Sequence, residues 1–225
     1  MSGILRRAMQ FVACSGFPVP VSRYWSELPS VEISDTENAV PGAGTVRRWL
    51  REAPPGFAFT VLAPKGIALG GFLQKGKSAP GLMDVGEVAK TLGAKALVFA
   101  APPELLPSRA IKAQLKAFAE ALPRGLPPVV FDLPAWHAEE VASAVTDAGA
   151  HAAYNPLAGA WPAKAPLLYF RLHGPAGHRS RYEESALEGV VNAVRDSKAK
   201  LTICVFTNVD MFANAKFILK QTTTT

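Results

Sequence analysis

The side chains best suited to chemistry gather in one short part of the sequence, residues 167–182. Its first half, LLYFRLHG, is apolar apart from Tyr169, Arg171 and His173, which occupy every second position. Side chains of a β-strand point alternately to opposite faces, so these three share one face. A guanidinium can bind an anion, and an imidazole can accept or donate a proton near neutral pH. The spacing therefore predicts a polar site on one face of a strand.

Two acidic residues stand on other apolar runs with the same alternation. Glu32 interrupts the run SVEIS, and Asp132 interrupts the run PPVVFDL. A buried guanidinium is costly unless it is paired and hydrogen bonded, so we expect Glu32 and Asp132 to be the partners of Arg171. The alternative is an ion-pair network that only fills the interior.

The last apolar run, LTICVFTN at residues 201–208, is also read as a strand with alternating faces. Its alternation leads us to place Ile203 and Val205 on the outer, helix-covered face. The predicted inward set is Thr202, Cys204, Phe206 and Asn208.

A glycine-rich loop, GPAGHRSRY, follows the 167–174 run. Gly174 and Gly177 would let backbone N–H groups approach an anion. An ordinary turn is the alternative for Gly-Pro-Ala-Gly. The ligand-binding residues predicted here are His178, Arg179, Arg181 and Tyr182. Two further histidines, His137 and His151, are predicted to have surface or capping roles away from the site.

Eight apolar, strand-like runs alternate with amphipathic, helix-like segments. The runs are 11–16, 30–34, 57–64, 95–102, 127–133, 151–156, 167–174 and 201–208. Helix starts are expected at Thr45, at Asp84 with Glu87 as a capping-box pair, and at Ser108. Glu139 and Glu140 are expected in a first helical turn.

Such alternation is typical of a parallel sheet covered by helices, and eight units fit a closed barrel. We predict an α/β fold, an irregular TIM-like β/α barrel, as one domain over residues 1–221, with a disordered Thr tail at 222–225. The connections 17–29 and 157–166 have weak helical patterns, which suggests the irregularity. A doubly wound open sheet is the alternative, although no Gly-x-Gly-x-x-Gly follows the first run. In a barrel, the polar faces must point inward, toward the strand ends where barrel enzymes place their chemistry.

The amino-acid composition narrows the classes of partner and the cellular location that we expect. The chain has 225 residues, 49% of them hydrophobic, and a formal net charge of +6, which favours anionic partners. Nucleic acid is a weaker expectation because no long run of Lys and Arg occurs. The two cysteines, Cys14 and Cys204, are expected to be buried thiols in a reducing cytoplasm. No run approaches the ~18 apolar residues of a membrane span. No metal ligands, cofactor or oligomeric state are predicted.

Several segments together resemble the YecE-like family, a domain of unknown function numbered 72. They are YW..LPSVEISDTE, RRWLREAPPGFAFTV, APPELLPS, PAWHAEEV, YFRLHG and FTN followed by ANA. The resemblance spans nearly the whole chain and implies a TIM-like barrel, with no settled activity. The positions that it carries over are Glu32, Thr36, Arg171, His173, Gly174, Tyr182, Asn208 and Asn214.

The chain also departs from the family pattern. Where the family has other, mostly polar residues, this chain has Ser34, Glu37, Asn38, Leu62, Ala68, Leu69, Ala100, Val130 and Asp132. The resemblance therefore implies a divergent member, with a pocket either rebuilt on fewer polar groups or inactive.

Together these observations suggest a hydrolase- or lyase-like enzyme for a small anionic or phosphorylated substrate. Arg171 would bind the anion, and Tyr169 and Asn208 would help to hold the substrate. Glu32 or Asp132 would act as general acid or base, and His173 would shuttle a proton. The alternatives are a nucleic-acid-binding barrel and a non-catalytic relative with a degenerate pocket.

Overall fold

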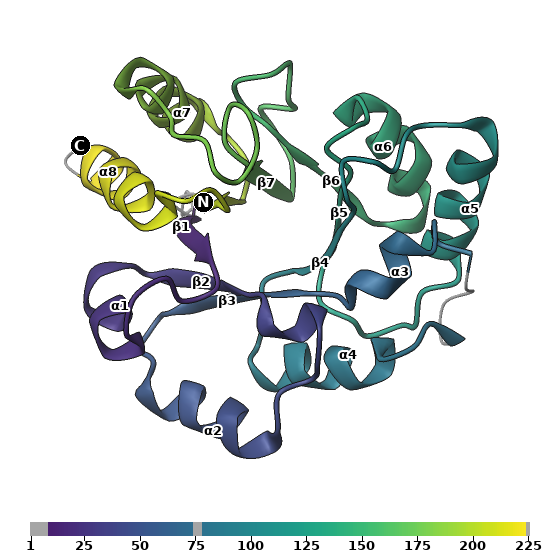
Figure 1. The fold of residues 1–225 in the computed structure, drawn as a ribbon, viewed down its shortest axis with the longest axis horizontal. Helices are drawn as coiled ribbons and strands as arrows, with labels where there is room; N and C mark the ends of the chain where they lie inside the picture. The colour runs from purple at the N-terminus through teal and green to yellow at the C-terminus, as the bar shows by residue number, and fades with distance from the viewer. Residues whose placement is uncertain (1–8, 74–77, 224–225) are drawn as a thin grey trace, which may run out of the picture.

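Eight parallel strands close into a barrel, as the sequence predicts. The computed structural model describes residues 9–73 and 78–223. The strands pair in chain order, and β8 returns to pair with β1 (Figure 1). Their bounds are β1 Met9–Ser15, β2 Ser30–Ile33, β3 Ala58–Leu62, β4 Leu97–Ala100, β5 Val129–Asp132, β6 His151–Tyr154, β7 Leu167–Leu172 and β8 Leu201–Phe206.

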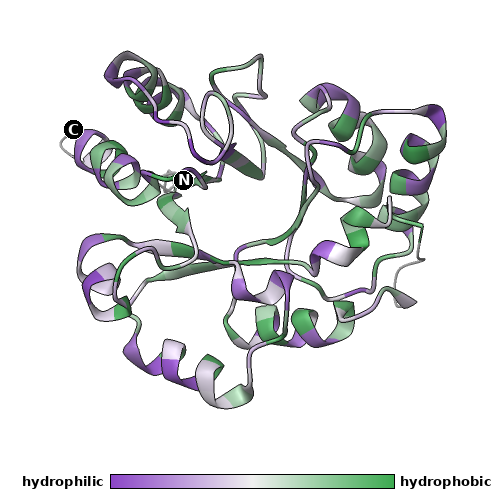
Figure 2. Cartoon of the chain, in the orientation of Figure 1, coloured by the Kyte–Doolittle hydropathy of each residue, from purple (hydrophilic) through white to green (hydrophobic). Residues whose placement is uncertain are grey.

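Helices surround this ring of strands (Figure 1). Their bounds are α1 Val21–Glu27, α2 Ala43–Glu52, α3 Lys65–Leu69, α4 Leu82–Thr91, α5 Arg109–Glu120, α6 Ala138–Val145, α7 Glu184–Asp196 and α8 Met211–Thr223. Two short 3₁₀ turns, η1 Asp35–Glu37 and η3 Thr146–Ala148, complete the described elements. The helices are green where they meet the strands and purple on much of their outer surface (Figure 2).

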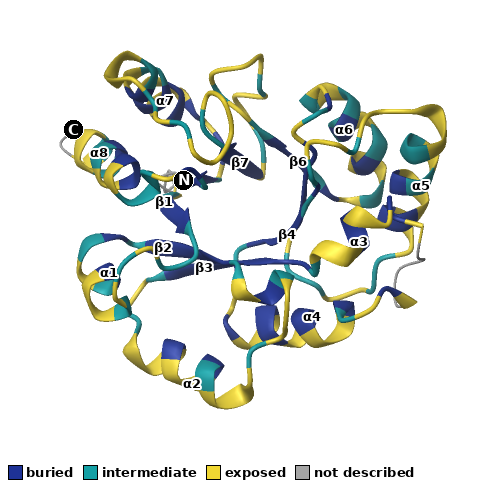
Figure 3. Cartoon of the chain, in the orientation of Figure 1, coloured by how far each residue is buried: buried dark blue, intermediate teal, exposed yellow. Residues whose placement is uncertain are grey.

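Each strand separates two apolar cores, because its side chains alternate between the barrel interior and the helix layer. Leu168, Phe170 and Leu172 of β7 join the large core beneath the helices. Tyr169 joins a smaller cluster inside the barrel with residues such as Val130 of β5. The strands are consequently buried on both faces (Figure 3). This arrangement confirms the inward direction predicted for the polar face of β7.

The prediction of which β8 side chains point into the barrel was wrong. Ile203 and Val205 belong to the interior cluster, whereas Cys204 and Phe206 belong to the core under the helices. The Phe206 ring packs edge-on against Tyr182, which lies in the loop before α7. Thr202 bonds to Ser197 just before the strand instead of facing a pocket. Strand β8 carries no charged side chain that needs a partner inside the barrel. Packing alone therefore decides which of its side chains point inward.

Helix starts agree only in part with the sequence. The Ser108 hydroxyl accepts a hydrogen bond from Ile111 N, so Ser108 caps α5 as predicted. Glu139 and Glu140 lie in the first turn of α6, also as predicted. The start expected at Thr45 is corrected to Ala43, and that expected at Asp84 to Leu82, each after a glycine N-cap. Glycine is accepted at this position because it needs no side-chain bond to adopt a non-helical backbone.

The two connections with weak helical patterns differ from each other. Residues 17–29 do contain a short helix, α1, whose Tyr24 is fully buried. Its hydroxyl donates to Ser30 O and accepts from Cys14 N, which ties α1 to β1 and β2. Residues 157–166 form no helix. There Trp161 packs edge-on against Phe170 of β7, at 5.2 Å between ring centroids.

Both cysteines are buried and free, as predicted. The Thr tail is corrected: Thr222 and Thr223 belong to α8, where their hydroxyls bond to carbonyl groups one turn earlier. Thr224 and Thr225 lie outside the described residues, as do the first eight residues. Within the described ranges no helix is long and apolar enough to cross a membrane.

Candidate functional site

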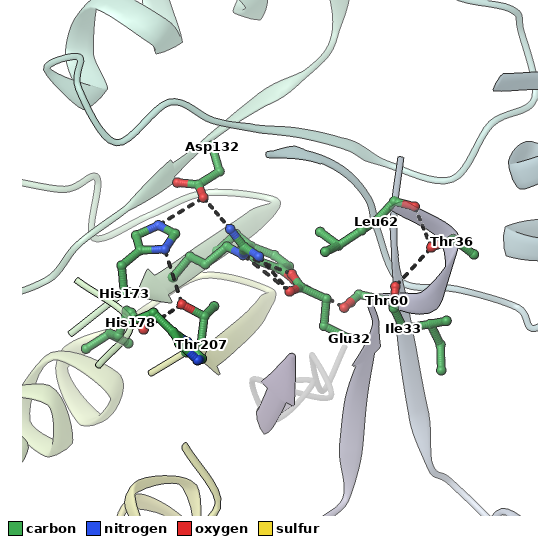
Figure 4. Close-up of polar contacts among 12 residues, drawn as sticks. Glu32, Ile33, Thr36, Thr60, Leu62, Asp132, His173, His178 and Thr207 are labelled. Carbon is green, nitrogen blue, oxygen red and sulfur yellow. Dashed lines mark hydrogen bonds and ion pairs between the residues drawn. The ribbon is translucent and has the colours of Figure 1, made fainter. Parts of the chain in front are cut away.

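An ion-pair centre lies at the carboxyl ends of three strands (Figure 4). It consists of Glu32 from β2, Asp132 from β5 and Arg171 from β7. Arg171 Nε lies 3.2 and 3.3 Å from the two Glu32 carboxylate oxygens, and Nη2 lies 3.0 Å from Oε1. Arg171 Nη1 lies 2.6 Å from Asp132 Oδ2. These contacts bring together the guanidinium and both carboxylates that the sequence predicts as partners.

Tyr169, two residues before Arg171 on β7, also contacts the ion-pair centre. Its hydroxyl donates to Glu32 Oε2 at 2.7 Å and lies 3.1 Å from the Thr60 hydroxyl. The ring is fully buried. Burial, followed by the negative charge of Glu32, raises the pKa of Tyr169 well above its usual value. Tyr169 is therefore a neutral donor that orients Glu32, and it does not line either cavity described below.

Arg171 retains hydrogen-bonding capacity after these contacts. A guanidinium has five N–H groups, one on Nε and two on each terminal nitrogen. The bonds to Glu32 and Asp132 engage each nitrogen once. One N–H on Nη1 and one on Nη2 thus have no acceptor among the described residues.

The charges in the centre are strongly coupled. Burial alone would raise the pKa of Asp132, but the nearby His173 and Arg171 outweigh it and lower that pKa to about 2. Burial opposes the charge of Arg171, yet Glu32 and Asp132 raise its pKa. Asp132 is thus an ionised and very weak base at neutral pH, which suits a residue that orients or stabilises a cation.

His173 follows the end of β7, and its side chain is 31% exposed. Its Nε2 lies 3.0 Å from Asp132 Oδ2, within ion-pair distance but without the alignment of a hydrogen bond. Its Nδ1 lies 3.2 Å from the Thr207 hydroxyl. The imidazole is thereby held between a carboxylate and a hydroxyl, and its Nε2 is itself shielded from solvent.

Two cavities meet at this centre, and we call them cavity 1 and cavity 2. Cavity 1, of about 430 Å³, lies at the carboxyl ends of β5 and β6. Cavity 2, of about 560 Å³, lies toward β4 and η1. Arg171, His173 and Pro134 contribute to the walls of both. The predicted polar site is therefore reachable from two sides.

Cavity 2 includes two charged residues that were not among the predicted site residues, Glu37 and Lys65. Glu37 ends η1 and Lys65 begins α3, so each lies just beyond a strand end. Partial burial, opposed by Arg171, raises the pKa of the Glu37 carboxyl. The signal that could have found both is their position directly after β2 and β3, where barrel sites are built.

His137 is exposed at the start of α6, as predicted, but the expectation that it lies away from the site is corrected. It is the N-cap residue of α6, without a side-chain capping bond, and it lines cavity 1 close to the ion-pair centre. Its place beside the mouth comes from the short turn between β5 and α6. His151, by contrast, begins β6 at the opposite end of the strand from the site, as predicted.

The glycine-rich loop after β7 contributes Gly177 and His178 to the wall of cavity 2. His178 lines cavity 2, and its Nδ1 lies 2.5 Å from Thr207 O. Arg179 and Arg181 are exposed and line neither cavity, and Arg181 pairs with Asp210 at 3.2 Å. The Tyr182 hydroxyl accepts a bond from Gly174 N, which fixes the shape of the loop.

Asn208 also lies apart from both cavities. Its side-chain amide donates to Ser180 O at 3.1 Å, and Asn214 Nδ2 donates to its Oδ1. Asn208 is fully buried. It therefore ties the loop after β7 to helix α8. No group of three or more His, Cys, Asp or Glu side chains in the described ranges is arranged to hold a metal ion.

A family model described as "Protein of unknown function DUF72" matches residues 20–223. The chain belongs to this family. No curated protein matches the chain. The solved structures that resemble this DUF72 protein include two members of the same family. One, from Enterococcus faecalis V583, is 17% identical, covers 98% of this chain and 99% of its own, and has a TM-score of 0.74. The other, from Thermotoga maritima MSB8, is 20% identical, covers 94% and 98%, and has a TM-score of 0.72.

At these identities the two DUF72 structures support the barrel fold and leave the chemistry to the residues of this chain. Several positions that depart from the family pattern are apolar here and pack in the barrel. Leu62 and Val130 belong to the interior cluster, and Ala100 lines cavity 2. The polar residues of this DUF72 pocket are thus concentrated around Arg171 and His173.

Proposed function

We propose that this protein is a hydrolase- or lyase-like enzyme that acts on a small anionic molecule, most simply a phosphorylated one. The observation that carries the proposal is the pair of unengaged N–H groups on Arg171, at the wall shared by the two cavities. A guanidinium fork of this kind matches the oxygens of a phosphate or a carboxylate.

The charges around cavity 2 support an anionic ligand. Lys65, Arg171 and His178 line it together with a single carboxylate, Glu37. Within the ion-pair centre, Glu32 and Asp132 already offset Arg171. The additional attraction for an anion therefore comes from Lys65 and from either histidine when it is protonated.

His173 and Glu37 are suited to move protons across cavity 2. In a hydrolysis, Glu37 would accept the proton of a water whose oxygen bonds to the phosphorus on the side opposite the leaving oxygen, and its raised pKa makes it a better base. His173, at the wall shared by the two cavities, would donate a proton from Nδ1, which faces the Thr207 hydroxyl, to the leaving oxygen as the ester bond breaks. Asp132 would hold the imidazole and stabilise its cationic form, as a carboxylate does in other histidine-dependent sites.

The proposal is tested by calorimetric titration of the protein with inorganic phosphate, followed by assay of phosphate release from a panel of phosphomonoesters. We expect saturable phosphate binding that weakens in Lys65→Gln and is unchanged in Arg181→Gln, whose side chain is exposed and outside both cavities. His173→Asn should keep binding and lose turnover. No saturable binding of any small anion would overturn the proposal.

A nucleic-acid-binding barrel predicts a different result. Affinity for a DNA or RNA duplex would fall steeply between 50 and 200 mM salt, roughly 10³-fold or more for six or more phosphate contacts. It would also depend on the exposed Arg179 and Arg181. That outcome would favour the alternative over the small-molecule enzyme.

A further inference from the structure

We propose that the substrate is an elongated phosphomonoester whose phosphate lies in cavity 2 and whose hydroxylated organic part, such as a sugar, lies in cavity 1. This inference rests on the proposed function and names the substrate class more narrowly. It follows from three observations: the sizes of the cavities, the difference in their linings and the residues they share.

The size of the two cavities argues against a small inorganic ligand. Cavity 1 measures about 430 Å³ and cavity 2 about 560 Å³. Cavities of about 300–1,000 Å³ are those that hold organic ligands of drug size. A single phosphate ion would leave most of this space to water, whereas a sugar phosphate would occupy parts of both cavities.

Cavity 1 offers groups that suit hydroxyls better than charge. Tyr154 and Asn155 line it, and the Tyr154 hydroxyl and the Asn155 side-chain N–H₂ have no hydrogen-bond partner among the described residues. Burial, and to a smaller degree Glu139, raises the pKa of Tyr154, so its hydroxyl stays a neutral donor and acceptor. Asn155 Oδ1 accepts a bond from Leu157 N, which fixes the direction of the amide.

An aromatic wall completes cavity 1. The Trp136 indole N–H donates to Leu105 O at 2.7 Å, so the ring is fixed in place and presents carbon atoms to the cavity. An aromatic surface beside a few oriented polar groups is the lining expected for an uncharged polar ligand. Arg171 in the wall of cavity 1 is already paired with Asp132, and cavity 1 lacks the additional cation that Lys65 gives to cavity 2.

The shared wall then sets where the two parts of the ligand join. Arg171 and His173 line both cavities, so a ligand that occupies both must pass over them. With phosphate beside Lys65 in cavity 2, the ester oxygen would lie at this wall, next to the imidazole. The bond to be broken would thereby lie where the proposed proton carriers are.

The test compares glucose 6-phosphate, inorganic phosphate and free glucose by calorimetry on the wild-type protein and two variants. We expect glucose 6-phosphate to bind at least tenfold more tightly than phosphate. Tyr154→Phe should reduce that advantage severalfold and leave phosphate affinity unchanged, whereas Lys65→Gln should weaken both anions. Ser143→Ala serves as a control for the loss of a hydroxyl, because Ser143 is exposed on α6 and lines neither cavity.

The outcomes separate the two proposals. If phosphate binds but glucose 6-phosphate gains nothing, or if its gain survives Tyr154→Phe and a second variant, Asn155→Ser, the elongated substrate is wrong and the anion site stands. If neither anion binds, both proposals fall. Free glucose binding as tightly as its phosphate would place the affinity outside the cationic cavity and overturn the assignment of the phosphate.

Discussion

Arg171, the penultimate residue of β7, and His173, the first residue beyond that strand, converge on one oxygen of Asp132. Arg171 Nη1 lies 2.6 Å from Oδ2, and His173 Nε2 lies 3.0 Å from the same atom. The strand period of two places both side chains on the interior face, and β5 supplies the carboxylate between them. Replacing any one of these three side chains therefore changes the electrostatic environment of the other two.

Replacing Arg171 should cost much more than replacing an exposed arginine. In Arg171→Met, Glu32 and Asp132 remain as two buried carboxylates without their cation, so we expect a loss of roughly 3–5 kcal/mol in the free energy of unfolding. Arg181→Met removes an exposed pair and should cost less than about 1 kcal/mol. Urea denaturation measures both. A double variant, Glu32→Gln with Arg171→Met, should recover part of the loss, and equal effects at the two arginines would contradict the coupling.

Asp132 should make the protein sensitive to acid. Its pKa is lowered from the ordinary 3.8 to about 2, so the ionised form stabilises the folded state. That contribution is complete above about pH 4 and is lost as the pH falls toward 2, on the order of 2 kcal/mol in total. Asp132→Asn should flatten the fall in stability between pH 4 and 2. Chemical denaturation over that pH range measures it, and parallel curves would argue against the shift.

Glu37 should behave in the opposite sense to an ordinary paired carboxylate. Its raised pKa means that the charged form is disfavoured in the folded state. Glu37→Gln should therefore gain stability relative to the wild type as the pH rises through that pKa. Glu27 is the matched control, because Lys216 first and Arg23 second lower its pKa. Glu27→Gln should lose stability relative to the wild type as the pH rises above its lowered pKa. The same sign for both variants would contradict the Glu37 environment.

The two glycines of the loop after β7 should respond differently to alanine. Gly174 and Gly177 have φ values of +91° and +90°, a region that costs other residues roughly 1–2 kcal/mol. A Cβ on Gly174 would also lie 2.3 Å from Gly177 O, whereas a Cβ on Gly177 meets nothing within 4 Å. Gly174→Ala should therefore be the more destabilising and should expose the loop to trypsin at Arg179. Similar cleavage rates in the two variants would argue against this crowding.

The ion-pair centre could be predicted from the sequence because charge leaves few choices inside a barrel. Alternation fixed the face of Tyr169, Arg171 and His173, and the cost of an unpaired guanidinium pointed to Glu32 and Asp132. The distances among these residues confirm that pairing. Their catalytic roles stay predictions.

The rest of the site depended on information that a linear pattern lacks. The phase of β8 was misassigned because its apolar residues fit either face, and only packing against Tyr182 and the helices selects one. Lys65 and His137 reach the cavities from turns whose direction is set by the closure of the barrel. Asn208 lies at a strand end as expected, but its buried amide is used by Ser180 and Asn214.

The connection between β6 and β7 contains no helix, and its length can therefore change more easily than that of the packed elements. Residues 158–160 of that segment are exposed and form part of the wall of cavity 1. Exposed loop backbone tolerates insertions and deletions far better than packed elements do. Changes in length there can reshape the room for a ligand while the guanidinium and its carboxylates stay untouched. Ligand preference can thus diverge among relatives through this one loop without loss of folding stability.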